Sequence, residues 1–175
     1  CIRDSRMAKK LGDAAKEINP ELLLYCNGID YEAQHDMGTY LEFECLPTGG
    51  WGYEALPMGA RYLRTLGKPT LNMSGRFHKS WGDFGGLRTQ ASLDYDLLNG
   101  LANGMRPMVG GHMHPRGDAD DAVFDLIENA YRRTSELMPW TDAAEAVADV
   151  GVIIPPYGLG YVDIRRYEQS QALLK

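Results

Sequence analysis

The chain has 175 residues, of which 44% are hydrophobic and 24% are charged. This composition is typical of a globular protein and excludes a disordered tail, a collagen-like repeat and a coiled-coil rod. The length suits one ordinary domain and is too short for a complete (β/α)8 barrel of about 250 residues. The net charge of -6, with 18 Lys and Arg scattered among 24 Asp and Glu, leaves no basic stripe and speaks against a nucleic-acid partner.

The cysteines Cys1, Cys26 and Cys45 are odd in number and widely spaced, so we expect them to be reduced. No apolar run approaches the ~20 residues that span a bilayer, which predicts no membrane partner. The first residues, Cys-Ile-Arg-Asp, resemble neither a signal peptide nor a natural start, and we expect the chain to be an interior segment of a longer protein. The sequence leaves the cellular compartment open.

Hydrophobic periodicity predicts helices and strands that alternate along most of the chain. Apolar positions recur at helical spacing over residues 4–18, and the apolar run over residues 22–26 has the length of a buried strand. Glycines directly after two later helical segments are typical of helix ends. The further elements that we predict are a strand at 40–45, a helix at 55–66 closed by Gly67, a strand at 70–77, a helix at about 89–103 closed by Gly104, a strand at 106–111 and a helix at about 119–137.

The last part of the chain differs in character from this alternation. After a break at Pro139 and Trp140, residues 148–154 form a fresh apolar run that ends at a pair of prolines. A helix over residues 164–174 would follow this predicted strand. We therefore predict two domains, over residues 1–141 and 146–175, the second present only as its first βα unit.

Strand and helix alternate four times, which argues for parallel strands with crossover helices and gives half the units of a (β/α)8 barrel. A doubly wound open sheet is the alternative. We favour the barrel because the strands at 40–45 and 70–77 each carry one apolar and one polar row. The apolar rows would face helices. The polar rows, Tyr40, Glu42 and Glu44 on one strand and Asn72, Ser74, Arg76 and His78 on the other, would face the barrel axis near the end where active sites form.

Glu42 and Glu44 are two positions apart on a predicted strand, so both point to the same side. Glu44 lies nearer the loop end, where a carboxylic acid could donate a proton to a substrate. Glu42 lies deeper, and burial of its charge would be costly unless it pairs with a cation such as Arg76 or Arg106. The alternative is that both are ion-paired scaffold acids at the barrel mouth.

Two loops after strands carry aromatic and polar side chains among glycines. Trp51, in the first loop, could stack on a sugar face or cover the barrel mouth. The second loop, over residues 75–86, is either a functional cluster or a set of side chains that hold the loop. Its candidate residues are Arg76, His78, Trp81 and Asp83.

His112 and His114 form a His-x-His pair, which opens the metal site of metal-dependent amidohydrolase barrels. No histidine follows His114, and the other two, His35 and His78, lie upstream. We therefore favour hydrogen bonding to a hydroxylated substrate, or a satisfied barrel histidine, over a metal site. We predict no cofactor.

Several motifs together are similar to a known family. Residues 41–53 (Leu-Glu-Phe-Glu-Cys-Leu-Pro-Thr-Gly-Gly-Trp-Gly-Tyr), the pair Arg61-Tyr62, residues 75–86 and the run His114-Pro115-Arg116-Gly117 resemble the hypothetical glycosyl hydrolases that include the α-L-fucosidases of glycoside hydrolase family 151. The resemblance implies that the chain is α/β, with the C-terminal half of a TIM barrel, about strands 5–8. The tail resembles the start of the flavodoxin-like β-galactosidase trimerisation domain, which implies a homotrimer.

The resemblance also implies a carbohydrate substrate and a retaining hydrolase with two carboxylates. Glu44 would be the acid/base, and the nucleophile would be an aspartate on the strand before Cys1, which the isolated segment would lack. In place of the family's Gly-Asp-Gln, this chain has Gly110-Gly111-His112, so a non-catalytic sugar-binding relic is an alternative. The residues that would bind hydroxyls or hold the acid are Glu42, Arg76, His78, Asp83 and His114, while Trp51 and Trp81 would exclude water around Glu44. With Glu42 counted as catalytic beside Glu44, the candidate substrate-binding residues are Trp51, Arg76, His78, Trp81, Asp83, His112 and His114.

Overall fold

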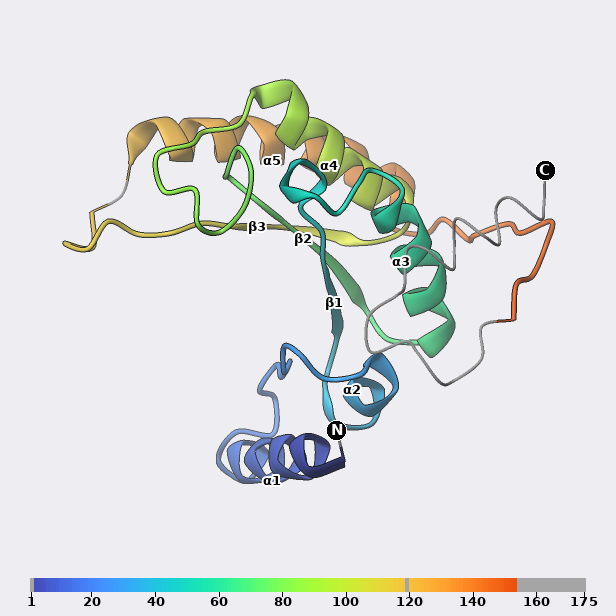
Figure 1. Ribbon diagram of the computed structural model, residues 1–175. Coiled ribbons are helices and arrows are strands. Elements are labelled where there is room, and N and C mark those ends of the chain that lie inside the picture. The colour runs from blue at the N-terminus through green and yellow to red at the C-terminus, as the bar shows by residue number, and fades with distance from the viewer. Residues whose placement is uncertain (1, 119, 154–175) are drawn as a thin grey trace. The chain divides into compact units, whose positions relative to one another are not determined.

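The computed structural model describes residues 2–118 and 120–153 (Figure 1). The chain divides into two compact units, which we describe one at a time. Within the described residues, the first unit comprises residues 2–41, 62–69 and 148–153, and the second comprises residues 42–61, 70–118 and 120–147.

The described part of the first unit begins with two helices. Helix α1 (Ile2–Ile18) confirms the helix predicted at the start of the chain, whereas the short helix α2 (Tyr31–Met37) was not predicted. A 3-10 turn, η2 (Arg64–Leu66), ends at Gly67 in the left-handed region with φ 69°. In the described part of the chain, no helix combines the length and the apolar character needed to cross a membrane.

Residues 22–26 do not form the predicted strand. The Leu24 amide donates to Thr39 Oγ1 at 2.7 Å, and the Thr39 amide donates to the Leu24 carbonyl at 2.9 Å. One paired residue is not the repeating ladder that a strand requires. The apolar run alone could not predict this, because strand formation depends on a neighbouring strand with free backbone groups.

The second unit contains a three-stranded sheet with the order β1-β2-β3. The strands are β1 (Leu41–Glu44), β2 (Thr70–Gly75) and β3 (Arg106–Gly110). β2 and β3 are parallel, with Leu71 opposite Arg106 and Gly75 opposite Gly110. Next to β2, the Cys45 amide that follows β1 donates to the Met73 carbonyl at 2.9 Å. The described residues therefore form a small parallel sheet of three strands, where four barrel strands were predicted.

Helices α4 (Gln90–Ala102) and α5 (Asp121–Thr141) lie side by side along one face of β2 and β3 (Figure 1). Leu93 and Leu97 of α4 pack with Leu126 and Ala130 of α5, and Val109 of β3 packs against this cluster. Burial of these side chains stabilises the sheet–helix contact.

The helix boundaries confirm most of the predicted signals. The Thr89 hydroxyl accepts from the Ser92 amide and caps α4, and Gly104 follows that helix with φ 80°. Helix α3 (Ala55–Leu63) continues into η2, so the predicted segment at 55–66 is helical throughout.

Two predictions for the C-terminal part need correction. Helix α5 continues past Pro139 to Thr141, because a proline in the last turn removes only one hydrogen bond of the helix. Residues 148–153 contain no strand. The rest of the predicted βα unit, including the helix at 164–174, lies outside the described residues.

Gly59 of α3 gives a first testable prediction. A Cβ atom at Gly59 would lie 2.6 Å from Cε2 of the buried Phe43 ring. Gly59→Ala should therefore lower the free energy of unfolding by about 1–3 kcal/mol through overpacking, although alanine favours helix. Chemical denaturation measures this change. Gly85→Ala is the control, because nothing lies within 4 Å of its added Cβ; equal stability of the two variants would contradict the close contact.

Candidate functional site

The two acids of β1 point away from helix α3. Phe43 lies against Gly59 of α3, so strand alternation directs Glu42 and Glu44 to the opposite face of the sheet. We call this face, which also carries Leu71 and Met73 of β2, the acid face. Cys45 lies on the other face, where burial, followed by the negative charge of Asp96, raises its thiol pKa to about 12.

On β2 the predicted direction of the polar row is wrong. Asn72 Nδ2 donates to the Asp96 carbonyl of α4 at 2.9 Å, and Ser74 Oγ donates to Asp96 Oδ2 at 2.7 Å. The polar side chains of β2 therefore face a helix, and its apolar residues Leu71 and Met73 lie on the acid face. The reason is that α4 supplies polar partners at this position, which makes burial of Asn72 and Ser74 tolerable.

Glu44 ends β1 and is only partly buried. The indole Nε1 of Trp81 donates to Glu44 Oε1 at 2.5 Å. The Trp81 ring lies against the Phe77 ring with centroids 4.7 Å apart, and a Cβ at Gly110 would lie 2.5 Å from Trp81 Cη2. The Phe77 ring and the close approach of Gly110 thus hold the Trp81 indole that binds the Glu44 carboxylate.

Glu42 lies one step deeper on the same face and is 5% exposed. Burial raises the pKa of the Glu42 carboxyl, and the nearby charge of Glu44 raises it further. Of the two cations predicted as its partners, Arg106 pairs with Asp142 at 3.0 Å. Arg76, the other, donates to backbone carbonyls and to a histidine.

Arg76 and His112 hold the loop over residues 76–88. The buried guanidinium of Arg76 donates to the carbonyls of Phe84 and Gly86 at 2.9 Å each, and to Nδ1 of His112 at 3.0 Å. Nε2 of His112 contacts the Trp81 carbonyl. At the base of the loop, the Arg88 amide donates to the Arg76 carbonyl at 3.3 Å. The loop therefore closes on itself, as compact surface loops do.

The structure brings Glu44, Trp81, His112 and Arg76 together, with Glu42 next to Glu44. Of the other predicted residues, His78 and Asp83 belong to the loop over residues 76–88, whereas Trp51 and His114 lie in other loops. Asp83 accepts from the Lys79 amide at 3.1 Å, His114 Nδ1 accepts from the Arg116 amide at 3.3 Å, Trp51 is half-buried with its amide donating to the Leu46 carbonyl at 3.4 Å, and His78 is exposed.

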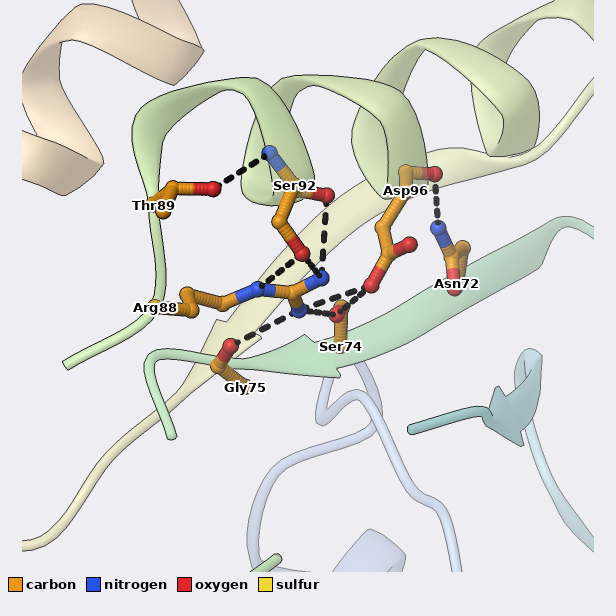
Figure 2. Close-up of polar contacts among 7 residues, drawn as sticks. All are labelled: Asn72, Ser74, Gly75, Arg88, Thr89, Ser92 and Asp96. Atoms are coloured by element: carbon orange, nitrogen blue, oxygen red, sulfur yellow. Dashed lines mark hydrogen bonds and ion pairs between the residues drawn. The ribbon is translucent and has the colours of Figure 1, made fainter. Parts of the chain in front are cut away.

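A buried ion pair behind the site was not predicted from the sequence. Arg88 and Asp96 are joined at 2.7 Å, with both side chains 1% exposed (Figure 2). The Arg88 guanidinium also donates to Ser74 Oγ at 2.9 Å, to the Gly75 carbonyl at 3.1 Å and to Ser92 Oγ at 2.6 Å (Figure 2). The pair anchors the end of β2 and the start of α4, directly next to Arg76. No motif or spacing in the sequence marks Arg88 and Asp96 as partners.

The packing of aromatic rings around His112 was also not predicted from the sequence. Phe84 stacks on the His112 ring with centroids 4.0 Å apart and planes at 14°, and the Phe77 ring lies at 4.4 Å. Phe84 belongs to the loop over residues 75–86, so the density of aromatic residues among its glycines was the available signal.

The described residues contain no group of three or more His, Cys, Asp or Glu side chains placed to hold a metal ion. Both ring nitrogens of His112 already have partners, Arg76 and the Trp81 carbonyl. The interpretation of His112 and His114 as metal ligands therefore gains no support.

The chain thus presents a parallel α/β sheet with a carboxylate, a tryptophan and a loop at the carboxyl ends of its strands, where α/β enzymes bind ligands. No protein-family profile matches the sequence, and no curated protein matches it either. Among solved structures, the chain is similar to α-L-fucosidase isoenzyme 2 from Paenibacillus thiaminolyticus, with a TM-score of 0.76 and 36% sequence identity. The similarity covers 83% of this chain and 23% of the fucosidase chain, so the chain spans under a quarter of that relative's length. This similarity supports a relationship to fucosidase-like glycosidases.

Proposed function

We propose that this chain is part of a retaining glycoside hydrolase that removes α-L-fucosyl groups from O-glycosides. The observation that carries the proposal is the 36% identity to an α-L-fucosidase over 83% of the chain. The resemblance to glycoside hydrolase family 151 and the position of Glu44 at a strand end agree with it.

Glu44 is the proposed acid/base. Its Oε1 accepts from Trp81, which leaves Oε2 to reach the glycosidic oxygen. In the first step the nucleophile bonds to the anomeric carbon, the bond to the leaving group breaks, and the leaving oxygen takes the Glu44 proton. In the second step Glu44 takes a proton from water, the water oxygen bonds to the anomeric carbon, and the nucleophile departs.

Glu42 lies next to Glu44 and is proposed to hold it or to bind a sugar hydroxyl, with the raised pKa of Glu42 favouring a carboxyl that can donate a hydrogen bond. The family resemblance would supply the nucleophile from an aspartate on the strand before Cys1. The candidate sugar-binding residues are Trp51, His78, Asp83 and His114.

The same resemblance leads us to propose the larger architecture. Residues 1–141 would belong to the C-terminal half of a TIM barrel, with β1, β2 and β3 as its strands six to eight. Residues 146–175 would begin a flavodoxin-like trimerisation domain, and the complete protein would be a homotrimer. Its molar mass in solution, measured by light scattering, tests the trimer.

The test of the function is a panel of nitrophenyl glycosides with the complete protein that contains this chain. We expect hydrolysis of the α-L-fucoside and, by proton NMR, first release of the α-anomer of fucose, as retention requires. Cleavage of another glycoside but not of the fucoside would contradict the proposed specificity for fucose. First release of the β-anomer would contradict retention of the anomeric configuration. Fucose binding without turnover of any glycoside would favour the relic, and loss of activity with a chelator would favour a metal-dependent hydrolase.

A further inference from the structure

The contacts of His112 define the direction of its hydrogen bonds. An arginine guanidinium carries only N–H donors, so His112 Nδ1, at 3.0 Å from Arg76, must be an acceptor. The ring proton then resides on Nε2, which donates to the Trp81 carbonyl. Arg76 thereby selects the one neutral tautomer of His112 that can hold Trp81.

Trp81 connects this histidine to the candidate acid. The backbone carbonyl of Trp81 accepts from His112, and its indole N–H donates to Glu44 at 2.5 Å. Phe77 contacts both the Trp81 ring, at 4.7 Å, and the His112 ring, at 4.4 Å. The histidine therefore fixes the main chain from which the indole extends, and Phe77 limits how far the ring can turn.

Arg76 is itself well fixed. It is 7% exposed, and its other two donated bonds go to the Phe84 and Gly86 carbonyls of the same loop. A guanidinium bound to two acceptors in its own loop and to His112 has little freedom to turn toward a sugar.

We propose that Arg76 and His112 are positioning residues that orient the Glu44 carboxyl through Trp81, rather than sugar-binding residues. This inference rests on the proposed function, since it assigns the arrangement to the proton transfer by Glu44. Misplacement of Glu44 would slow both proton transfers, and only the first, in which the leaving oxygen takes its proton, depends on the leaving group.

The experiment replaces His112 in the complete protein. His112→Phe keeps a ring between Phe77 and Phe84 but loses both hydrogen bonds, whereas His112→Gln retains one acceptor and one donor. We expect His112→Phe to lower kcat/KM, which reports the steps through release of the leaving group, by up to about 100-fold for a methylumbelliferyl fucoside. The loss should be much smaller for a chloronitrophenyl fucoside, whose leaving group needs little protonation, and His112→Gln should restore much of the rate. His35→Phe, which replaces an exposed histidine of α2, is the control and should keep the wild-type rate.

An equal loss on both substrates, or no loss, would overturn the proposal, because a general disturbance of the fold does not distinguish leaving groups. If His112→Phe does not fold, substitutions at two adjacent glycines test whether the position of the Trp81 ring controls Glu44. A Cβ at Gly110 would lie 2.5 Å from Trp81 Cη2, whereas a Cβ at Gly111 would make an ordinary 3.4 Å contact with Arg76 Cγ. Gly110→Ala should show the same leaving-group dependence, and Gly111→Ala should not.

A second readout does not depend on activity. The indole ¹⁵N–¹H signal of Trp81, assigned by its loss in Trp81→Phe, should lie downfield because the indole donates to a carboxylate. The signal should move upfield in Glu44→Gln and in His112→Phe, and stay in place in His35→Phe. An unchanged signal in His112→Phe would overturn the positioning role even if the protein is a fucosidase. A shifted signal in a protein that cleaves no fucoside would contradict only the proposed function.

Discussion

Glu44→Gln is expected to lower kcat/KM for fucosides with poor leaving groups by about 100- to 10,000-fold, the range that general acid catalysis contributes. Glutamine fills the same space and can still accept the Trp81 indole bond, but its amide cannot protonate the departing oxygen. Fucosides with acidic leaving groups should lose much less in their first step. Steady-state kinetics over a series of aryl fucosides measures the difference.

Sodium azide makes the assignment more specific. Azide needs no general base, so it should accelerate the second step in Glu44→Gln and yield fucosyl azide. Glu54→Gln, in the exposed part of the loop before α3, is the control and should keep the wild-type rate. Equal losses for all leaving groups together with no response to azide would rule out Glu44 as acid/base.

The sequence predicted the site best where local pattern is enough. The apolar residues Leu41 and Phe43 of β1 alternate with acids, and this pattern correctly predicted that Glu42 and Glu44 share one face. The turns at Gly67 and Gly104 were predicted as helix ends, and both have the left-handed backbone that glycine tolerates.

The prediction failed where distant residues decide the outcome. Asn72 and Ser74 have the alternation of a barrel interior, but they face α4, where Asp96 binds both side chains and Arg88 also binds Ser74. The run at 22–26 is apolar enough for a strand, yet Thr39 rather than a neighbouring strand pairs with Leu24. In both cases the deciding partner is far away in the sequence, and the local pattern carries no information about it.

The hydrogen bond between Trp81 and Glu44 also joins residues that are far apart in the sequence. The sequence identified both residues as candidates but gave no reason to join them across 37 positions. That contact depends on the closed loop over residues 76–88, which is held by Arg76, His112 and the base contact from Arg88.

The second large effect is expected at the buried ion pair. Arg88→Met should lower the free energy of unfolding by about 3–5 kcal/mol, because it leaves the Asp96 carboxylate buried without its cation. Asp96 Oδ1 already has no hydrogen-bond partner among the described atoms, so the remaining carboxylate has little to compensate the loss. Such a change is a large part of the total stability of a small domain. Urea denaturation followed by circular dichroism measures it.

Arg106→Met is the control, since Arg106 also pairs with a carboxylate, Asp142, at 3.0 Å. Both side chains of that pair are 48% exposed, against 1% for both partners of the buried pair, so water replaces the lost contact and we expect a change below about 1 kcal/mol. Removal of both partners in Arg88→Met with Asp96→Leu should be less harmful than Arg88→Met alone, because no uncompensated charge remains buried. Equal losses of stability in Arg88→Met and Arg106→Met would show that the cost does not come from an isolated buried carboxylate. The same conclusion would follow if the effects of Arg88→Met and Asp96→Leu on the free energy of unfolding were additive.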